Sequence, residues 1–486
     1  MFIRFKPLLA CLLFMLVSTV TSAAVNLQGT TDIHDPSTIM REDGVYWTFG
    51  TGTGAGGSPI NALYSTDMIN WQRGPSPIAP NTYPNWINGK VPGFDGNFWA
   101  PDIIEMKGKY YLYYSAFSAS QGMHSAIGVM VTDSLNNPNW QDLGMLVSTN
   151  DDPVSSAGFS VNAIDAGVYR DTAGKVWMIY GSHYAGIFIR QLNPDNGKLM
   201  SNTRYPAVGS GGDWNEFEAA QVQYLNGYYY LFANLADCCK GKESDYYIVM
   251  GRSTSPTGPF LDKNNVDMWN YGGSTVLSTE GIYIGPGHFG YLRHGEQDLA
   301  TIHYYDGNSA TGWPARLDVL KIQFGNDNWP YFTRNLNLSN DTRLRDGRVS
   351  ITSVLSGKAL EVSNAGLSDG DNLVQWGYWG GTNQQWDIVH VGGGYYSITN
   401  VASGKSIDVY DWSQDNEGNI VQWELWGGEG QRWLMQYTGN GHYALRSAWS
   451  GLALDVFDMS TQDGANIVQW EYWGGEGQQW NINYLD

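Results

Sequence analysis

Cysteine is nearly absent from this sequence, which contains only Cys11 and the adjacent pair Cys238 and Cys239. Three cysteines in 486 residues exclude a disulfide framework as the basis of the fold, so buried apolar cores must stabilise it. A bridge between neighbours would be strained, because consecutive Cα atoms lie about 3.8 Å apart and disulfides usually span at least about 4.4 Å. The sequence leaves open whether Cys238 and Cys239 form this bridge or remain two thiols.

Basic residues are also scarce: 27 lysines and arginines stand against 47 acids, which gives a formal net charge of −20. So acidic a chain is repelled by nucleic acids and anionic membranes, and neither is expected as a partner. Only 15% of the residues are charged, whereas 14% are aromatic and glycine occurs 60 times. Because aromatic residues favour strands and glycine favours turns, we expect two or three all-β domains.

The N-terminal residues 1–24 have the pattern of a secretory signal peptide. Arg4 and Lys6 form a basic start, the apolar run "LLACLLFMLVSTV" follows, and "TSAA" supplies small residues for cleavage. A membrane anchor is the alternative, although the run is short for a span of ~20 residues. A lipoprotein signal at Cys11 would have almost no apolar segment before it. We expect a secreted protein, extracellular or periplasmic; loss of the two basic residues changes the net charge from −20 to −22.

Residues 347–486 contain a unit that is repeated three times. The pattern Gln-x-Trp recurs every 47 residues, in "DNLVQWGYWGGTNQQW", "GNIVQWELWGGEGQRW" and "ANIVQWEYWGGEGQQW". The upstream segments "SGKALEV", "SGKSIDV" and "SGLALDV" place acids at the same period, at Glu361, Asp408 and Asp455. Three units of short strands and glycine turns predict one shared core, in which we expect the triplet tryptophans to be buried.

This repeat resembles ricin-type β-trefoil lectin modules, also called carbohydrate-binding module family 13. In that family each unit can hold one sugar through an acid, an aromatic ring and amide side chains. The resemblance implies a sugar site at Asp408 in unit two. In unit three it implies a site formed by Asp455, Asn466, Tyr472 and Gln478. Unit one departs from the pattern because its acid is a glutamate, one methylene longer.

The N-terminal part of the chain repeats more faintly. Five segments begin at a glycine and continue as an alternating aromatic strand: "GVYWTFGT", "GKYYLYYSAF", "GKVWMIYGSH", "GYYYLFANL" and "GEQDLATIHYY". Their starts lie 53 to 68 residues apart, which suits a four-stranded sheet, and apolar residues on both faces suit packing between neighbouring sheets. We therefore predict a five-bladed β-propeller over residues 25–332, a polar linker at 333–346 and a β-trefoil at 347–486.

A titratable residue stands at the start of the strand before each of these five segments. The positions are Asp35, Asp102, Asp165, Glu218 and His288. For Asp35, Asp165 and Glu218 the distance to the following glycine is nine residues in each case. Because the first strand of each blade lines the propeller axis, the five side chains should surround one pocket. Such a cluster predicts catalysis; alternatively, each acid bonds neighbouring backbone amides.

Several carboxylates in a pocket, within a chain rich in Trp and Tyr, suit glycoside hydrolysis. One acid protonates the leaving oxygen and another activates water, while a third can raise the pKa of the proton donor. The chain here resembles glycoside hydrolase family 43, and within it the α-L-arabinanases, over roughly residues 30–325. The resemblance rests on "HDPSTI", "FWAPDI", "NAIDAGVYRD", "EFEAAQV", "CCKGKESDYYIVMGRSTSPTGPF" and "GPGH".

The resemblance implies cleavage of α-1,5-linked L-arabinofuranosyl bonds in arabinan by an inverting mechanism. It assigns the general base to Asp35, the general acid to Glu218 and the pKa-modulating acid to Asp165. It also implies a calcium ion near His288, held largely through waters.

Trp99, Asn162 and Asp102 are the candidates for substrate contact, with packing or strand-end hydrogen bonding as the alternatives. Two departures bear on the shape of the cleft, since Ala166 and Ala220 stand where arabinanases usually have proline.

Several alternatives remain open at this point. Glu216 lies two residues before Glu218, so it would point to the same face of a strand and is the rival proton donor. The enzyme could be an exo-acting arabinanase, an arabinofuranosidase or a xylosidase, and a non-catalytic glycan-binding lectin is a different class of function. The expected partner is plant cell-wall arabinan, free or attached to pectin, bound by a monomer. The trefoil would raise the local concentration of substrate.

Overall fold

The computed structural model describes residues 26–54, 57–120, 123–151, 160–209, 215–295, 297–336, 338, 344, 346–391, 394–439 and 441–485. Within these ranges the regular elements are mostly strands, together with short 3-10 helices and one short α-helix, α1 (Ile87–Lys90). No helix in these ranges is long and apolar enough to cross a membrane. The predicted signal peptide lies outside the described residues, as does much of the predicted linker.

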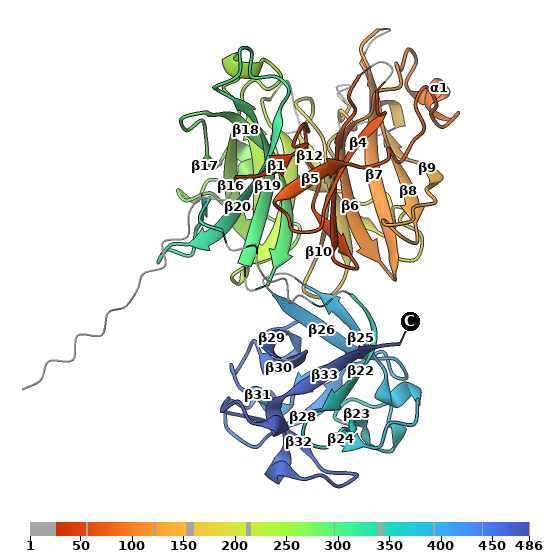
Figure 1. Ribbon diagram of the computed structural model, residues 1–486, viewed down its shortest axis with the longest axis vertical. Helices are drawn as coiled ribbons and strands as arrows, with labels where there is room; N and C mark the ends of the chain where they lie inside the picture. The colour runs from red at the N-terminus through yellow and green to blue at the C-terminus, as the bar shows by residue number, and fades with distance from the viewer. Residues whose placement is uncertain are drawn as a thin grey trace, which may run out of the picture.

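The N-terminal domain is a ring of five sheets, antiparallel except for the pairing of β1 with β5 (Figure 1). Blade one contains β1 (Gln28–Gly29), β2 (Met40–Glu42), β3 (Val45–Thr51), β4 (Ile60–Ser65) and β5 (Asn70–Arg73). Blade two contains β6 (Trp99–Met106), β7 (Lys109–Ser118), β8 (His124–Thr132) and β9 (Gln141–Ser148). Blade three contains β10 (Gly167–Arg170), β11 (Val176–Tyr180), β12 (Ile187–Leu192) and β13 (Tyr205–Val208).

Blade four contains β14 (Glu218–Leu225), β15 (Tyr228–Leu235), β16 (Tyr247–Ser253) and β17 (Ser274–Leu277). Blade five contains β18 (Tyr283–His294), β19 (Gln297–Asp306), β20 (Arg316–Phe324) and β21 (Pro330–Thr333). The five aromatic segments of the sequence form β3, β7, β11, β15 and β19, the strand after the innermost one in each blade. The predicted five-bladed propeller is therefore confirmed.

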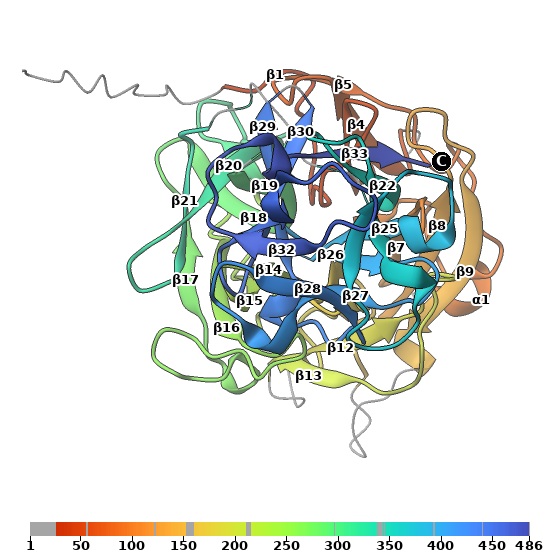
Figure 2. The same ribbon diagram turned by 90° about the horizontal axis from the view of Figure 1, so that it is seen from below.

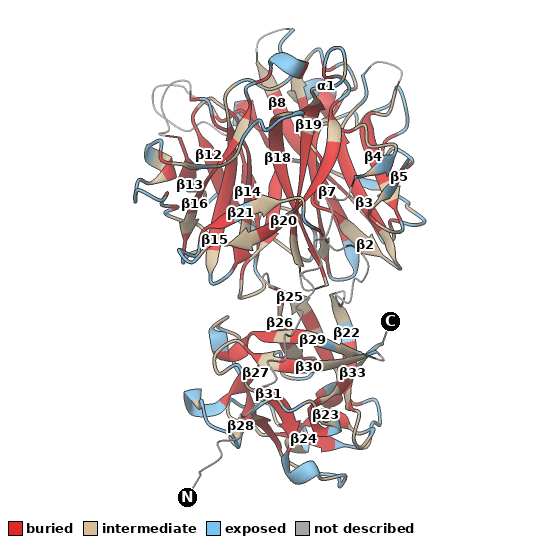
Figure 3. Ribbon diagram, turned by 60° about the vertical axis from the view of Figure 1, so that its left-hand side comes forward, coloured by how far each residue is buried: buried red, intermediate tan, exposed pale blue. Residues whose placement is uncertain are grey.

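Apolar side chains on both faces of each sheet build a separate core between each pair of neighbouring blades. For example, Phe49 of blade one packs with Leu112 of blade two, and Phe232 of blade four packs with Phe289 of blade five. The inner strands β14 and β18 are buried over most of their length (Figure 3). This arrangement explains why the strands read as aromatic runs rather than as strictly alternating ones.

The ring is closed by hydrogen bonds between the start of the propeller and blade five. The backbone N–H of Leu317 donates to the carbonyl of Thr31 at 2.8 Å, and that of Ile33 donates to Ala315 at 3.0 Å. The same start of the chain also pairs with blade one, because β1 runs parallel to β5. The N-terminal segment thus joins the first blade to the last.

The C-terminal domain is a twelve-stranded sheet with threefold repetition. Its strands are β22 (Gly347–Ser353), β23 (Ala359–Val362), β24 (Leu373–Trp376), β25 (Trp386–His390), β26 (Tyr395–Asn400), β27 (Ser406–Val409), β28 (Gly418–Trp423), β29 (Trp433–Gly439), β30 (His442–Ser447), β31 (Ala453–Val456), β32 (Ile467–Trp470) and β33 (Trp480–Tyr484). Trp386, Trp433 and Trp480 are 0% exposed, and each indole N–H donates to a backbone carbonyl 26 residues upstream, at 3.1 to 3.2 Å. The expectation that these tryptophans form the trefoil core is confirmed.

The trefoil lies against the propeller at the turns that follow the inner strands (Figure 1), and from below it covers the centre of the ring (Figure 2). Arg432 is only 5% exposed; it donates a hydrogen bond to the hydroxyl of Tyr224 in β14, and its guanidinium lies 4.9 Å from that ring's centroid. Arg170 at the end of β10 forms an ion pair with Asp346 at 3.4 Å. The starts of the inner strands, where the predicted catalytic residues lie, are therefore at the other end of the propeller.

Candidate active site

The starts of the inner strands share an unusual backbone conformation. In each blade one non-glycine residue near this point has a positive φ: Asp35 (51°), Ala100 (42°), Asp165 (56°), Ala219 (51°) and His288 (58°). Register shifts lie beside three of them, in β6, β14 and β18. Bulges of this kind redirect side chains, and left-handed non-glycine residues tend to gather at functional sites. All five blades thus have this conformation at the place where the sequence predicted the pocket.

Asp35 is surrounded by imidazole side chains. Its carboxylate is 2.7 Å from Nδ1 of His34 and 3.5 Å from Nδ1 of both His288 and His303, and it accepts a hydrogen bond from the hydroxyl of Thr51. Burial opposes ionisation of Asp35. The charge and hydrogen bond of His34 are the largest effects that outweigh burial, and with the two other imidazoles they lower the pKa of this carboxyl well below its usual value. Asp35 is therefore an anion at neutral pH.

Asp165 has the opposite environment. Burial and the negative charges of Glu218 and Asp35 raise the pKa of Asp165 well above its usual value, although the backbone N–H of Ala219 donates to its carboxylate at 3.0 Å. Tyr246 lies in the same cluster, where burial and the charges of Glu218, Asp165 and Asp35 all raise the pKa of its phenol. The structure thus brings together the three carboxylates that the nine-residue offset selected.

Glu218 opens β14 and is held by two residues that the sequence reasoning did not select. The hydroxyl of Ser182 donates to Oε2 of Glu218 at 3.1 Å, and Nε2 of His183 lies 3.1 Å from the same oxygen. Both residues stand in the segment "GSH" that ends the aromatic run of blade three, which the sequence showed but did not link to blade four. The rival acid Glu216 precedes β14 and is exposed.

His288, the predicted calcium ligand, is buried beside Asp35, and its backbone N–H donates to Oδ1 of Asn234 at 3.0 Å. Burial lowers the pKa of His288 despite the nearby Asp35 charge, which keeps the imidazole neutral and able to bind a cation. His34, Asp35 and His303 offer ligand atoms within 4.8 Å of one another. Since calcium prefers oxygen, this imidazole-rich set fits calcium only with water in most coordination positions.

The structure places the three candidates for substrate contact differently. Trp99 is half-buried and stacks on Phe117, with ring centroids 4.6 Å apart. Asn162 is buried and accepts a hydrogen bond from the hydroxyl of Ser125 at 2.8 Å. These contacts match the packing and hydrogen-bonding alternatives of the sequence analysis, and substrate contact remains a prediction for both residues.

Asp102 is 3% exposed and joins four blades. Its carboxylate accepts hydrogen bonds from the backbone N–H groups of Thr38 at 2.9 Å and Val168 at 2.8 Å, and from the amide of Gln221 at 2.7 Å. Burial raises the pKa of Asp102 to about 6, against the effect of these bonds. This geometry corresponds to the alternative in which the acid bonds neighbouring backbone amides.

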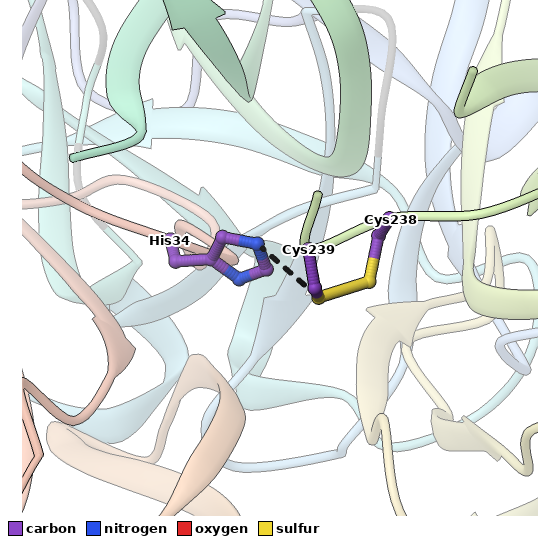
Figure 4. Close-up of side chains that lie close together, drawn as sticks. All are labelled: His34, Cys238 and Cys239. Atoms are coloured by element: carbon purple, nitrogen blue, oxygen red, sulfur yellow. Dashed lines mark hydrogen bonds between the residues drawn. A yellow bond between two sulfur atoms is a disulfide. The ribbon is translucent and has the colours of Figure 1, made fainter. Parts of the chain in front are cut away.

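Cys238 and Cys239 form a disulfide between adjacent residues, with Cα atoms 3.8 Å apart, which answers a question that the sequence left open. Figure 4 shows the bridge beside His34, whose Nε2 lies 3.8 Å from the sulfur of Cys239. The same nitrogen lies 2.8 Å from the hydroxyl of Tyr305, and the imidazole stacks on His303. Because both sulfurs are oxidised, they offer no thiolate to a metal. The bridge instead helps to enclose the imidazole that contacts Asp35.

In the trefoil, Asp408 lines a cavity of about 310 Å³ together with exposed aromatic residues. Its Oδ2 accepts hydrogen bonds from the amide of Gln431 at 2.8 Å and from the indole of Trp426 at 3.4 Å. Trp412 and Trp426, which line the same cavity, are 50% and 46% exposed. The cavity therefore offers an acid and aromatic surface to a ligand.

The residues predicted for unit three occupy two different places. The carboxylate of Asp455 is buried and accepts hydrogen bonds from the side chains of Gln478 and Trp473. Tyr472, the residue before Trp473, is half-buried. Gln478 is 0% exposed; its amide donates to the carbonyl of Glu471 at 3.0 Å, so it supports the loop beneath the surface.

Asn466 lies elsewhere, in a ring of side-chain amides that repeats every 47 residues. Asn372 donates to Asn466 at 2.7 Å, Asn466 to Asn419 at 3.0 Å and Asn419 to Asn372 at 2.7 Å. The structure therefore brings Asp455 and Gln478 together but places Asn466 among its repeat counterparts.

Comparisons with known proteins bear on both domains. Residues 28–330 match the model of "Glycosyl hydrolases family 43", and residues 334–423 and 429–486 match that of "Ricin-type beta-trefoil lectin domain-like". The chain is 34% identical over 313 residues to the extracellular exo-alpha-(1->5)-L-arabinofuranosidase ArbA of Cellvibrio japonicus, covering 62% of this chain and 86% of that protein. It is 32% identical over 297 residues to the extracellular endo-alpha-(1->5)-L-arabinanase 1 of Bacillus subtilis, covering 58% and 87%.

A solved structure gives the same result for the propeller. The endo-arabinanase of Bacillus licheniformis superimposes with a TM-score of 0.55 at 35% identity, covering 63% of this chain and 99% of that chain. The resemblance drawn from the sequence motifs is thus confirmed at the level of the family. The chain belongs to family 43 of the glycosyl hydrolases and is a glycosidase with a C-terminal ricin-type β-trefoil lectin domain.

Proposed function

We propose that this glycosidase hydrolyses α-1,5-linked L-arabinofuranosyl bonds in arabinan and inverts the anomeric configuration. The observation that carries the proposal is the cluster of Asp35, Asp165 and Glu218, in which the surroundings lower the pKa of Asp35 and raise the pKa of Asp165. Two carboxyl groups in contrasting environments are what acid–base cleavage of a glycosidic bond needs. The substrate is supported by the relatives that are named for action on α-1,5-linked arabinose.

In this mechanism Asp35 removes a proton from a water molecule, whose oxygen forms a bond to the anomeric carbon. The bond from that carbon to the leaving oxygen breaks at the same time, and Glu218 donates its proton to that oxygen. An inverting pair needs a separation of roughly 6.5–9.5 Å to admit the water. Asp35 belongs to blade one and Glu218 to blade four, so the two groups approach the sugar from different sides of the axis.

Asp165 acts on both partners in this proposal. Its carboxylate accepts from the backbone N–H of Ala219, directly after Glu218, and so orients the start of β14. Because Asp165 is buried beside the other two acids, three negative charges in this place would repel one another strongly. The cluster therefore retains a proton that is available for the leaving group.

A calcium ion held near His288, largely through waters, would supply positive charge to a pocket of three carboxylates. This role belongs to the proposal and rests on the family resemblance together with the neutral, buried imidazole of His288. The protein's own share of that site is to position His288 through its backbone bond to Asn234.

We further propose that the protein is secreted as a monomer and acts on cell-wall arabinan, free or attached to pectin. Three relatives are named extracellular, which supports export. The trefoil would bind polysaccharide at the Asp408 cavity and at Asp455, which raises the local substrate concentration without altering the chemistry.

Product analysis over time on linear arabinan, branched arabinan and xylan tests this function. Native protein should release arabinose or arabino-oligosaccharides and leave xylan intact, with the inverted anomer visible by NMR in the first minutes. Glu218→Gln should lose about 10³-fold in rate on these polymers, whereas Glu216→Gln, its matched control, should retain activity. Activity on xylan alone, or an unaffected Glu218→Gln, would contradict the assignment.

The same experiment distinguishes endo from exo action, because relatives of both kinds match this chain. A spread of short oligosaccharides from the start would indicate endo cleavage. Arabinose or one oligosaccharide size from the start would indicate exo cleavage.

A further inference from the structure

His183 has no role in the mechanism above, yet it touches the proposed proton donor. Its Nε2 lies 3.1 Å from Oε2 of Glu218, and its side chain is 23% exposed while that of Glu218 is 14% exposed. The imidazole is thus more accessible to solvent than the carboxylate that it touches. Ser182, the residue before it, donates to the same carboxylate oxygen and holds it in place.

The other edge of the imidazole determines which nitrogen carries the proton. Nδ1 of His183 lies 3.0 Å from the backbone carbonyl of Asn215, and a carbonyl can only accept, so Nδ1 must carry a hydrogen. The side-chain amide of Asn215 donates in return to the carbonyl of His183. In the neutral ring Nε2 is therefore a lone pair that faces Glu218, and it can accept a proton or a hydrogen bond from that acid.

The charges around His183 favour its protonation. Burial alone lowers the pKa of this imidazole, but the hydrogen bond and charge of Glu218, the carbonyl of Asn215 and the charge of Glu216 outweigh burial and raise it. Among the residues that the structure describes, Glu216 and Glu218 are charged groups that act on the ring, and both are acids. His183 therefore keeps a proton on Nε2, beside Glu218, to a higher pH than an isolated imidazole would.

We propose that His183 is a positioning residue that returns a proton to Glu218 between turnovers. This role of His183 rests on the proposed role of Glu218 as general acid. After Glu218 has given its proton to the leaving oxygen, it is a carboxylate beside Nε2. A hydronium ion from solvent transfers a proton to Nε2, which leaves water and an imidazolium. The N–H bond then breaks and the proton moves to Oε2, which restores the neutral carboxyl and the neutral imidazole.

Two results are expected of a histidine that supplies protons and are not expected of a purely structural one. The rate should depend on His183 only for substrates whose leaving group needs protonation. The alkaline limb of the pH–rate profile should report the loss of the proton that His183 and Glu218 exchange. Removing the imidazole of His183 should therefore move this limb to lower pH.

Two variants separate proton supply from packing. His183→Phe removes the nitrogen, whereas His183→Gln keeps an amide near the position of Nε2 that can donate a hydrogen bond but cannot carry the proton. Both should lose about tenfold or more in kcat on arabino-oligosaccharides and less than about twofold on a 2,4-dinitrophenyl arabinofuranoside, whose leaving group needs no acid. The alkaline limb should move down by about one pH unit or more. His442→Phe in the trefoil is the matched control and should leave all three measurements unchanged.

Folded His183→Gln with the native pH profile and native kcat on oligosaccharides would overturn the proposal. An equal loss on the activated substrate would also overturn it, because it would indicate damage to the pocket rather than lost proton supply. Glu218→Gln distinguishes the two levels of argument. If that variant is inactive while the His183 variants match the native protein, only the proton-supply role fails; if it remains active, the assignment of the acid itself fails.

Discussion

The strongest single test of the domain arrangement is the substitution Arg432→Gln. The three repeats carry Gln385, Arg432 and Gln479 at the same position, so glutamine is compatible with the trefoil itself. Arg432 differs because it lies at the contact with the propeller, where its guanidinium donates to the hydroxyl of Tyr224 and lies 4.9 Å from the centroid of that ring. The ring of Tyr395, within the trefoil, is 5.7 Å from the same guanidinium.

The expected magnitude follows from these contacts. A hydrogen bond from a charged donor contributes about 1.5–3 kcal/mol, and a desolvated cation–π contact about 1–2 kcal/mol. Because glutamine retains part of the polar contact, we expect a loss of about 3 kcal/mol of docking free energy. This corresponds to a fall of roughly a hundredfold in the equilibrium constant for docking.

Small-angle scattering and limited proteolysis measure this change. Arg432→Gln should increase the radius of gyration and speed the proteolytic separation of the two domains, while the trefoil still unfolds cooperatively. Lys405→Gln, which removes a surface ion pair with Asp369 in the same domain, is the control and should cost less than about 1 kcal/mol. An unchanged radius and cleavage rate in folded Arg432→Gln would refute the inference that this arginine holds the domains together.

Three further predictions follow from the site and the trefoil. Because burial raises the pKa of Asp102 to about 6, the folded protein binds this proton more tightly than the unfolded chain. Stability should therefore fall as pH rises from about 4 to about 6, and Asp102→Asn should lack that component in thermal unfolding; a change confined to KM would contradict this. Deleting residues 347–486 should spare hydrolysis of soluble oligosaccharides and weaken action on insoluble polymer, whereas equal loss on both would show a structural role for the trefoil. Chelation should reduce activity and calcium should restore it better than magnesium, and His288→Ala should abolish that response; native activity after complete chelation would argue against the ion.

The architecture of both domains could be predicted from the repeats in the sequence alone. The 47-residue period and the five glycine-led aromatic strands are local signals, because each unit must bury the same faces against its neighbours. The nine-residue offset that grouped Asp35, Asp165 and Glu218 is also a local distance along the chain. It placed these residues correctly at the starts of inner strands because every blade begins in the same way.

Only the tertiary structure decided which partners these residues meet. Asp102 stands at an equivalent position, yet amide groups of three other blades occupy its carboxylate. His183 contacts Glu218 although 35 residues and a blade boundary separate them, and Asn466 lies among its counterparts from the other repeats rather than beside Asp455. Such contacts depend on how separate units pack around an axis, and the spacing of residues along the chain does not specify which side chains meet across that packing.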